Sequence, residues 1–300
     1  MTSHNNALPD RRFSFGKNWA EFLTHSLDTE RVAIAIRQTG SFLGVSDLRG
    51  LTFMDIGCGS GLFSYAAYAM GAERITSFDL DPLAVQCCLT MKERAGNPDN
   101  WEVFQGSILD PGALQRLPLV DVVYAWGVLH HTGDMWAAVR HAASFVKPGG
   151  CLFVSIYNRL EYDSLTRYRG SHGWLRIKRA YNRSGWLGKR IMECWFAGKD
   201  IAVSLLSLRN PLGHIRHYRN KRGMSWWYDI VDWLGGYPYE FASASEVFQF
   251  CRRELGLTLE RLKTNSSIGC NEFLFSRPAT DHSEESLWSI RAVASFSDTG

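Results

Sequence analysis

Long apolar runs are missing from this sequence of 300 residues. No stretch approaches the roughly 20 consecutive apolar residues that a transmembrane helix needs, and residues 1–13 lack the apolar core of a signal peptide. We therefore expect a cytoplasmic protein. Its hydrophobic content of 45% is enough to bury one large core, alone or with a smaller subdomain.

Patterns typical of metal sites and disulfide frameworks are also missing. The seven cysteines include no C-x-x-C pair, and they are scattered through predicted core elements. This spacing argues against a zinc site, and the odd number adds to the argument against a disulfide framework. We expect reduced, mostly buried thiols and no bound metal.

A glycine-rich turn is the most informative feature of the chain. It has the pattern D-x-G-x-G-x-G at residues 55–61, directly after an apolar run, and a second short apolar run ends at Asp79, 22 residues after Gly57. The alternation of apolar runs with a helical pattern predicts a β–α–β unit. Its expected parts are a strand at 51–56, a helix at 62–70 and a strand at 74–78.

The residue types in this unit suit a nucleoside ligand. Glycines let the loop backbone approach a ligand closely and adopt positive φ, and the N-terminus of the following helix presents unpaired N–H groups. A carboxylate at the tip of the second strand, here Asp79, can accept both hydroxyls of a ribose. A dinucleotide fingerprint would need a glycine where Leu62 stands. An NAD-type or purely structural crossover is the alternative interpretation.

The motifs DIGCGSG and DLDPLAV resemble motif I and the following acidic motif of the class I S-adenosylmethionine (SAM)-dependent methyltransferases. The pattern VLHHT, a helix, KPGG and a strand is similar to the same family. The resemblance implies SAM as cofactor, with the glycine loop against its methionine part, Asp79 on its ribose and the residues after the third strand around its adenine. The cofactor-binding residues on these motifs are Asp55, Gly57, Cys58, Gly59, Gly61, Asp79, Leu80, Ser107 and Ile108.

The apolar pattern and the resemblance together predict an α/β fold. We expect a Rossmann-like, seven-stranded, mostly parallel sheet with helices on both faces, and a last strand that runs antiparallel to its neighbours. After the first unit, strands are expected at 101–106, 120–125, 151–157, 257–263 and 271–277. The expected helices lie at 82–95, 135–145 and 243–255, and Ser243 or Ser245 caps the last of them.

Residues 126–131 follow the predicted fourth strand, at the edge where open parallel sheets bind ligands. We predict that Trp126 contacts the cofactor. His131 or His130 is a candidate to touch the substrate or to act as general base, because histidine titrates near neutral pH. The alternatives are that one histidine packs or caps the next helix, and that positioning alone promotes the in-line methyl transfer.

Aromatic residues gather near the N-terminus, in the segment FSFGKNW at 13–19, ahead of a helical pattern at 20–42. We expect this segment to fold over the bound cofactor as a lid, with Lys17 and Trp19 in contact with it. The alternative is a helix that covers the edge of the sheet.

About eighty residues separate the fifth strand from the next expected helix, more than the family usually has. Residues 159–222 hold 15 Lys or Arg and four Asp or Glu, a charge of +11, whereas the whole chain has +3. A helical cap over the active site that binds an anionic small molecule is the favoured interpretation. A membrane-facing surface, a nucleic-acid platform and an ordinary solvated face are the alternatives.

Residues 223–240 (GMSWWYDIVDWLGGYPYE) combine aromatic side chains with acids at helical spacing. We predict that this stretch forms a wall of the substrate site, although a core helix that docks the cap on the sheet is the alternative. Asn271, at the start of the last expected strand and beside the loop at the ligand side of the sheet, is a further candidate. The predicted substrate-binding residues are Trp226, Asp229, Asp232, Trp233, Tyr237 and Asn271.

The predicted function is transfer of a methyl group from SAM to an O, S or N atom of a small-molecule acceptor, anionic or thiol in character. An RNA methyltransferase that docks through the basic insertion and a noncatalytic SAM-binding module are the alternatives. The oligomeric state is not indicated. The expected divisions are an N-terminal helical lid segment (1–50), a SAM-binding core (51–157), a basic and aromatic helical cap (158–240), the last helix and hairpin of the core (241–277) and a polar tail (278–300).

Overall fold

One seven-stranded sheet forms the centre of the molecule. The computed structural model describes residues 13–25, 27–161, 170–207, 210, 213, 215, 226–267 and 269–279. Its strands are β1 (Thr52–Ile56), β2 (Arg74–Asp79), β3 (Trp101–Gln105), β4 (Val120–Trp126), β5 (Val146–Tyr157), β6 (Thr258–Lys263) and β7 (Cys270–Ser276). They follow the order β3-β2-β1-β4-β5-β7-β6, and β7 runs antiparallel to both neighbours. The predicted fold class is confirmed.

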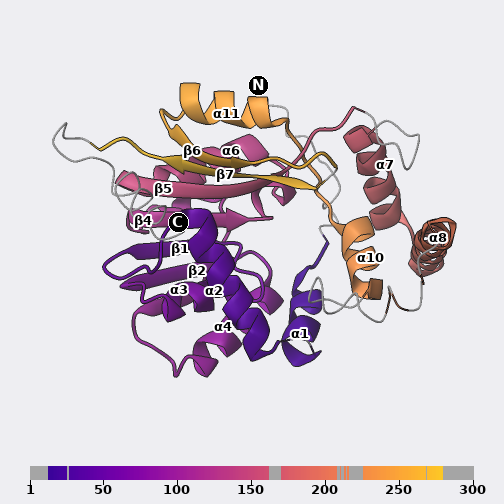
Figure 1. The fold of residues 1–300 in the computed structure, drawn as a ribbon, viewed down its shortest axis with the longest axis horizontal. Helices are drawn as coiled ribbons and strands as arrows, with labels where there is room; N and C mark the ends of the chain where they lie inside the picture. Colours follow the sequence, from indigo (N-terminus) through magenta and orange to yellow (C-terminus); the bar gives the residue numbers. More distant parts are fainter. Residues whose placement is uncertain are drawn as a thin grey trace.

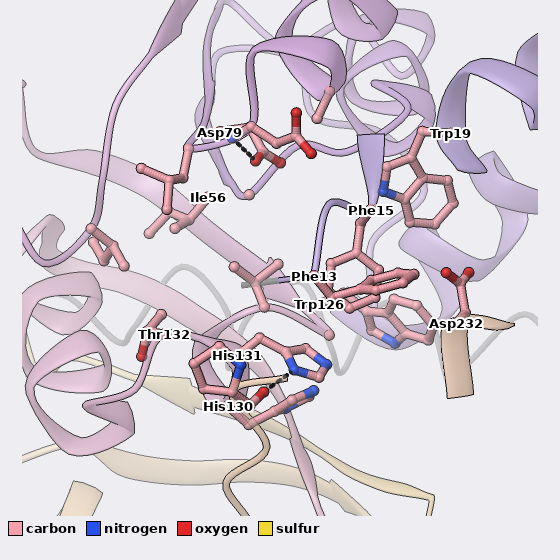
Figure 2. Close-up of a pocket in the computed structure, with 18 of the residues that line it drawn as sticks. Phe13, Phe15, Trp19, Ile56, Asp79, Trp126, His130, His131, Thr132 and Asp232 are labelled. Carbon is pink, nitrogen blue, oxygen red and sulfur yellow. Dashed lines mark hydrogen bonds between the residues drawn. The ribbon is translucent and has the colours of Figure 1, made fainter. Parts of the chain in front are cut away.

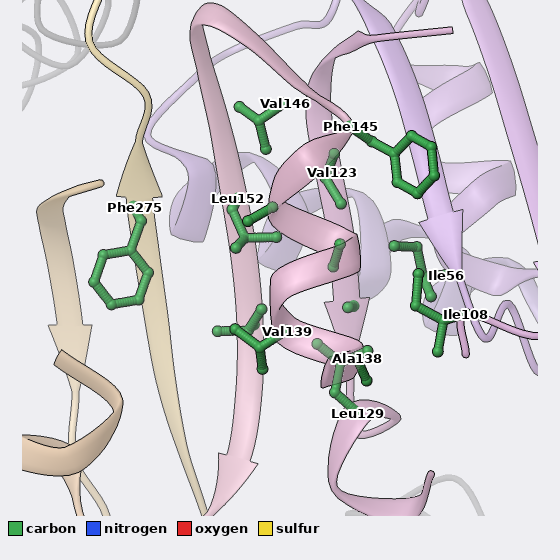
Figure 3. Packing of buried hydrophobic residues seen from close by; sticks show 14 of the residues in the cluster. Ile56, Ile108, Val123, Leu129, Ala138, Val139, Phe145, Val146, Leu152 and Phe275 are labelled. Carbon is green, nitrogen blue, oxygen red and sulfur yellow. The ribbon is translucent and has the colours of Figure 1, made fainter. Parts of the chain in front are cut away.

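Helices cover both faces of the sheet (Figure 1). The helices in the described part of the chain are α1 (Gly16–His25), α2 (Thr29–Leu43), α3 (Leu62–Ala69), α4 (Pro82–Arg94), α5 (Pro111–Leu114), the 3-10 turn η1 (Leu129–His131), α6 (Met135–Ser144), α7 (Gly170–Arg183), α8 (Trp186–Leu206), α10 (Trp226–Gly235) and α11 (Ala244–Arg253). Side chains of α2, α3 and α4 pack in one apolar cluster, and those of α6 and α11 pack in another. Figure 3 shows the second cluster, in which Val139 of α6 packs together with Val123 of β4 and Leu152 of β5.

Local sequence signals set several helix ends. Asp81 caps α4 by accepting a hydrogen bond from the Leu83 N–H at 2.9 Å, and Pro82 occupies the first turn, where its missing N–H costs nothing. Ser243 and Glu246 form a reciprocal capping box at the start of α11. The predicted Ser243 cap is therefore confirmed.

Two predicted boundaries are wrong. The helix expected at 20–42 is two helices, because Asp28 caps a new one and accepts a 2.8 Å hydrogen bond from the Arg31 N–H. The KPGG sequence, expected to be a turn before the fifth strand, lies inside β5. Val146 already pairs with Val120 there, and an irregularity in register follows before Cys151 pairs with Val122.

The described part of the segment between β5 and α11 contains three helices, α7, α8 and α10, which we call the insertion helices. They have an apolar cluster of their own, with Trp174, Tyr181, Ile230 and Leu234 buried in it. In Figure 1 the insertion helices lie together at one end of the molecule, with α10 nearest to the sheet and close to α1.

Candidate functional site

A cavity of about 830 Å³ opens at the carboxyl ends of the parallel strands (Figure 2). The turns after β1, β2, β3 and β4 form one side of it, and the N-terminal segment and α10 form the other. Because an open parallel sheet places its loops at this edge, the cavity is where the fold predicts a ligand.

The glycine loop between β1 and α3 lies against other parts of the chain so closely that side chains are excluded. Gly57 has φ of +69°, and a Cβ there would lie 2.4 Å from Cγ1 of Val128. Gly61 has φ of +76°, and its Cβ would lie 2.7 Å from Cα of Cys88. Both positions therefore need glycine for conformation and for space.

A buried chain of hydrogen bonds holds this loop from behind. Nε1 of Trp101 donates to Oγ of Ser77 at 2.9 Å, Ser77 donates to Oγ of Ser64 at 2.8 Å, and Ser64 donates to Oδ2 of Asp55 at 2.5 Å. Burial raises the pKa of Asp55 to about 7, and the Ser64 hydrogen bond opposes this shift. Asp55 does not line the cavity, so it fixes the loop rather than facing the ligand space.

Asp79 faces the cavity from the tip of β2. Its Oδ2 accepts from the Gly59 N–H at 3.0 Å and its Oδ1 from the Asp81 N–H at 2.9 Å. Burial raises the pKa of Asp79, and these backbone hydrogen bonds oppose the shift. Since a carboxylate has about four lone-pair sites, Asp79 can accept a further hydrogen bond from a ligand hydroxyl on its cavity side.

His130 and His131 both line the cavity, and each is oriented by a backbone carbonyl. Nδ1 of His130 lies 3.1 Å from the Ser155 carbonyl oxygen, and Nδ1 of His131 lies 2.5 Å from that of Pro238. A carbonyl oxygen only accepts, so in both neutral rings Nδ1 carries the proton and Nε2 the lone pair. Burial lowers the pKa of both, that of His131 to about 3.

The N-terminal segment joins the core to the insertion helices across the cavity. Oγ of Ser14 and the Gly16 N–H donate to Oδ2 of Asp81 at 2.7 and 2.9 Å, while the Phe13 N–H donates to the Tyr237 carbonyl at 3.1 Å. Nδ2 of Asn18 also donates to Oδ1 of Asp232. These contacts hold the N-terminal segment against the cavity, which Phe13, Phe15 and Trp19 line.

The helix α10 has two different faces. Ile230 and Leu234 are buried in the cluster of the insertion helices, whereas Asp229, Asp232 and Trp233 line the cavity. The docking interpretation fits the buried face of α10, and the substrate-wall interpretation remains a prediction for the face that lines the cavity. Figure 2 shows Asp232 and Trp126 pointing into the same space.

Most residues predicted at the site do line the cavity, but several do not. Those that line it are Gly57, Asp79, Leu80, Ser107, Ile108, Trp126, Trp19, His130, His131, Asp229, Asp232, Trp233 and Tyr237. Those outside the lining are Asp55, Cys58, Gly59, Gly61, Lys17, Trp226 and Asn271. The binding roles of the residues in both groups remain predictions.

Each outlying residue has another place in the structure. Lys17 is exposed, whereas Cys58, within the loop, is buried. Nε1 of Trp226 donates to Oδ2 of Asp200 at 2.7 Å, away from the cavity. Asn271 is buried, and its Oδ1 accepts from the Asn265 N–H at 2.8 Å, so it shapes the loop between β6 and β7.

Sequence reasoning missed several lining residues, among them Tyr157, Asp81 and Glu272. Tyr157 ends β5, so the rule that placed Trp126 at the carboxyl edge also applies to it. Glu272 lies in β7, which runs in the opposite direction and approaches the edge by its first residues. No local pattern marks that position. Among the described residues no cluster with the ligands for a metal ion occurs, and no helix there is long and apolar enough to cross a membrane.

The substitution Ser64→Ala removes the donor to Asp55 and the acceptor of Ser77 within a buried chain. Leaving such groups unpaired should lower the free energy of unfolding by about 2 kcal/mol. Chemical denaturation measures this loss. Ser144→Ala, at an exposed position where Oγ donates to the His141 carbonyl, is the matched control and should change stability little. Equal stabilities of the two variants would contradict the role given to Ser64.

Burial and the neighbouring Asp229 raise the pKa of Asp232 from 3.8 to about 8. Between these values the unfolded chain releases a proton that the folded protein keeps, so wild-type stability should fall as pH rises. Asp232→Asn should remove this loss and stabilise the protein at pH 7 by ~1 kcal/mol or more. Denaturation at pH 4.5 and pH 7 tests this, with the exposed Asp99→Asn as control. A pH-independent difference between Asp232→Asn and wild type would contradict it.

Comparison with known proteins agrees with this geometry. The pattern of the family described as "Methyltransferase domain" matches residues 29–229. A ubiquinone biosynthesis O-methyltransferase of Methylobacterium sp. (strain 4-46) is 32% identical over 147 residues, which are 44% of this chain and 55% of that protein. A ribosomal protein L11 methyltransferase of Photobacterium profundum is 33% identical over 127 residues, 42% of this chain and 40% of that protein. The chain thus spans about half the length of the relatives it matches.

Solved structures agree in fold. Magnesium protoporphyrin IX methyltransferase from Synechocystis PCC 6803, solved with bound SAM, has a TM-score of 0.50 at 13% identity, covering 91% of this chain and 99% of that one. An O-methyltransferase family protein from Burkholderia thailandensis has a TM-score of 0.50 at 14% identity, covering 91% and 67%. The family pattern, which covers more than half of the sequence, together with the glycine loop and the strand order, shows that the chain belongs to the class I SAM-dependent methyltransferases.

Proposed function

We propose that this protein transfers a methyl group from SAM to an O, S or N atom of a small-molecule acceptor, held between the edge of the sheet and α10. The observation that carries the proposal is one cavity that is lined by Gly57 and Asp79 at one side and by Asp232 and Trp233 at the other. A volume of about 830 Å³ is within the range of small-molecule sites.

The residues present fit the cofactor. Gly57 presents only backbone to the cavity that it lines, and Asp79 faces the same cavity with a carboxylate that can accept from the ribose. Ser107 and Ile108 line the region where adenine would lie. When bound, SAM supplies an electrophilic methyl group, and the residues of this chain orient the two reactants and exclude water.

For His131 we favour positioning over proton transfer. Its low pKa, about 3, makes the imidazole a weak base near neutral pH. Its ring is fixed between the Pro238 carbonyl and the rings of Phe15 and Tyr157, whose centroids lie at 5.1 and 5.5 Å. A rigid neutral ring there can orient an acceptor. Its role as general base, like that of His130, stays a prediction.

We further propose that the N-terminal segment acts as the lid and that the insertion helices act as the cap. The contacts of Ser14 with Asp81 and of Asn18 with Asp232 support a lid that is fastened at both sides of the cavity. Much of the basic sequence at 159–222, and the tail after residue 279, lie outside the described residues. The expectations for those parts stay predictions.

Incubation of the protein with methyl-labelled SAM and a cell extract tests the acceptor class. After separation into small-molecule, RNA, lipid and protein fractions, we expect label in the small-molecule fraction, because the cavity has the volume of a small-molecule site and lies between the sheet edge and α10. Label in RNA, lipid or protein instead would contradict the small-molecule proposal and favour macromolecular docking through the insertion. Label in no fraction, with SAM bound, would favour a noncatalytic binding module.

Asp79→Ala should weaken SAM binding by about 1 to 3 kcal/mol, the amount expected when hydrogen bonds to a charged group are lost. Isothermal titration calorimetry measures the affinity, and the thermal midpoint shows whether the loop of Gly59 remains folded. Asp99→Ala, at an exposed position outside the cavity, is the matched control. An unchanged affinity of Asp79→Ala would remove this residue from the ribose site.

A further inference from the structure

The helix α8 carries large apolar side chains on the outside of the molecule. Eleven large hydrophobic side chains are exposed in the described part of the chain, and six of them belong to this one helix of 21 residues. The six are Trp186, Leu187, Ile191, Trp195, Leu205 and Leu206. Single exposed apolar residues are ordinary, but their concentration on one element marks an interaction surface.

These side chains form one face of the helix. Leu187, Ile191 and Trp195 follow one another at steps of four residues, which keeps them on the same side. The exposed positions continue at steps of three and four residues with Gly198 and Ala202, up to the last turn. No acid lies on this face. At a rise of 1.5 Å per residue it runs for about 30 Å.

The two acids of α8 point the other way, toward α7 and α10. Glu193 is buried, and its Oε1 accepts from the Tyr181 hydroxyl at 2.6 Å while its Oε2 pairs with Nη1 of Arg190 at 2.7 Å. Oδ2 of Asp200 accepts from Nε1 of Trp226 at 2.7 Å. A surface helix ordinarily buries apolar side chains and exposes charged ones. Since α8 buries an acid and exposes its largest apolar side chains, its outer face is suited to contact an apolar medium.

The surroundings of this face are cationic. The helix α7 contains four Lys or Arg and no acid, and Arg176, Arg179 and Arg183 are exposed along it at steps of three and four residues. Arg183 ends α7 and Trp186 begins α8, so the arginine row ends where the apolar face begins. In Figure 1 α8 lies on the side of the insertion helices that is away from the sheet. Nothing in the described core therefore stands in front of it.

We propose that α8 docks this protein on the surface of a membrane that contains anionic lipids. Its apolar face enters the boundary between headgroups and acyl chains, where Trp side chains are favoured and Leu and Ile leave water. The arginines of α7 and the basic sequence around them are attracted by the lipid phosphates. The helix lies on the membrane and does not cross it, since no helix in the described ranges is long and apolar enough to do so.

Two other occupants fit this surface less well. A second copy of the chain would bring its own arginine row to the same place, and like charges oppose such a pair. A nucleic acid would be attracted by the arginines, but aliphatic side chains such as Leu187 and Ile191 offer no ring on which bases stack. An anionic membrane is the partner that uses both the charge and the aliphatic face.

Vesicle flotation of the full chain tests the proposal. Vesicles of phosphatidylcholine alone are compared with vesicles of phosphatidylcholine and phosphatidylglycerol. We expect roughly tenfold or tighter binding to the anionic vesicles, with a loss at high salt because counterions screen the arginines. No binding to either kind, or equal binding to both, would overturn the proposal. No SAM enters the measurement, so its outcome is independent of the proposed function.

Substitutions assign the binding to α8. Leu187→Gln with Ile191→Gln should weaken binding to the anionic vesicles roughly tenfold or more, because two apolar side chains no longer enter the lipid. The wild-type side chains are 64% and 61% exposed, so the fold should persist, and the thermal midpoint checks this. Leu119→Gln with Leu262→Gln, at exposed positions outside the insertion helices, is the matched control and should bind as wild type does. Equal binding of the two double variants would overturn the assignment.

A second pair of substitutions tests the charge. Arg176→Gln with Arg179→Gln should weaken binding to the anionic vesicles roughly tenfold and leave that to neutral vesicles unchanged, whereas Arg176→Lys with Arg179→Lys should keep it. An unchanged preference in the Gln pair would refute the role of α7. Sedimentation equilibrium tests the second copy. A dimer that Leu187→Gln with Ile191→Gln dissociates, or tight binding of RNA, would refute membrane docking if no vesicles are bound.

Discussion

The hydrogen-bond chain from Trp101 to Asp55 is the constraint on which the ligand edge of the sheet depends. It ties β3 to β2, β2 to α3 and α3 to β1, and every member is buried. An unpaired polar group at such depth is costly, so the glycine loop between β1 and α3 has little freedom to move away from its neighbours. The fixed loop in turn gives Gly59 the position from which its N–H meets Asp79.

The other side of the cavity has a different origin. It is assembled from segments more than 200 residues apart in sequence, since Asn18 meets Asp232 and Phe13 meets Tyr237. The insertion helices have their own apolar cluster, which holds α10 with Ile230 and Leu234 inward and its acids toward the cavity. The core thus supplies one side of the cavity, with the glycine loop and Asp79, and the N-terminal segment and α10 supply the other.

Much of the fold followed from local patterns. The glycine turn, the acid 22 residues later and the capping residues Asp81 and Ser243 act within a few residues of themselves, so their spacing predicted the elements well. Predictions failed where a local signal was read too simply. Asp28 caps a new helix inside a continuous apolar pattern. Val146 pairs with Val120, so β5 begins before the KPGG sequence and includes it.

The sequence by itself determined the family, the order of the elements and the edge of the sheet that holds the loop and Asp79. It did not determine which charges face the cavity. Residues 159–222 are strongly basic, yet the described lining is acidic. The reason is that composition gives only the number of charged side chains in a segment, whereas packing decides which of them face the cavity. Because Ile230 and Leu234 are buried on one face of α10, Asp229 and Asp232 lie on the face that lines the cavity.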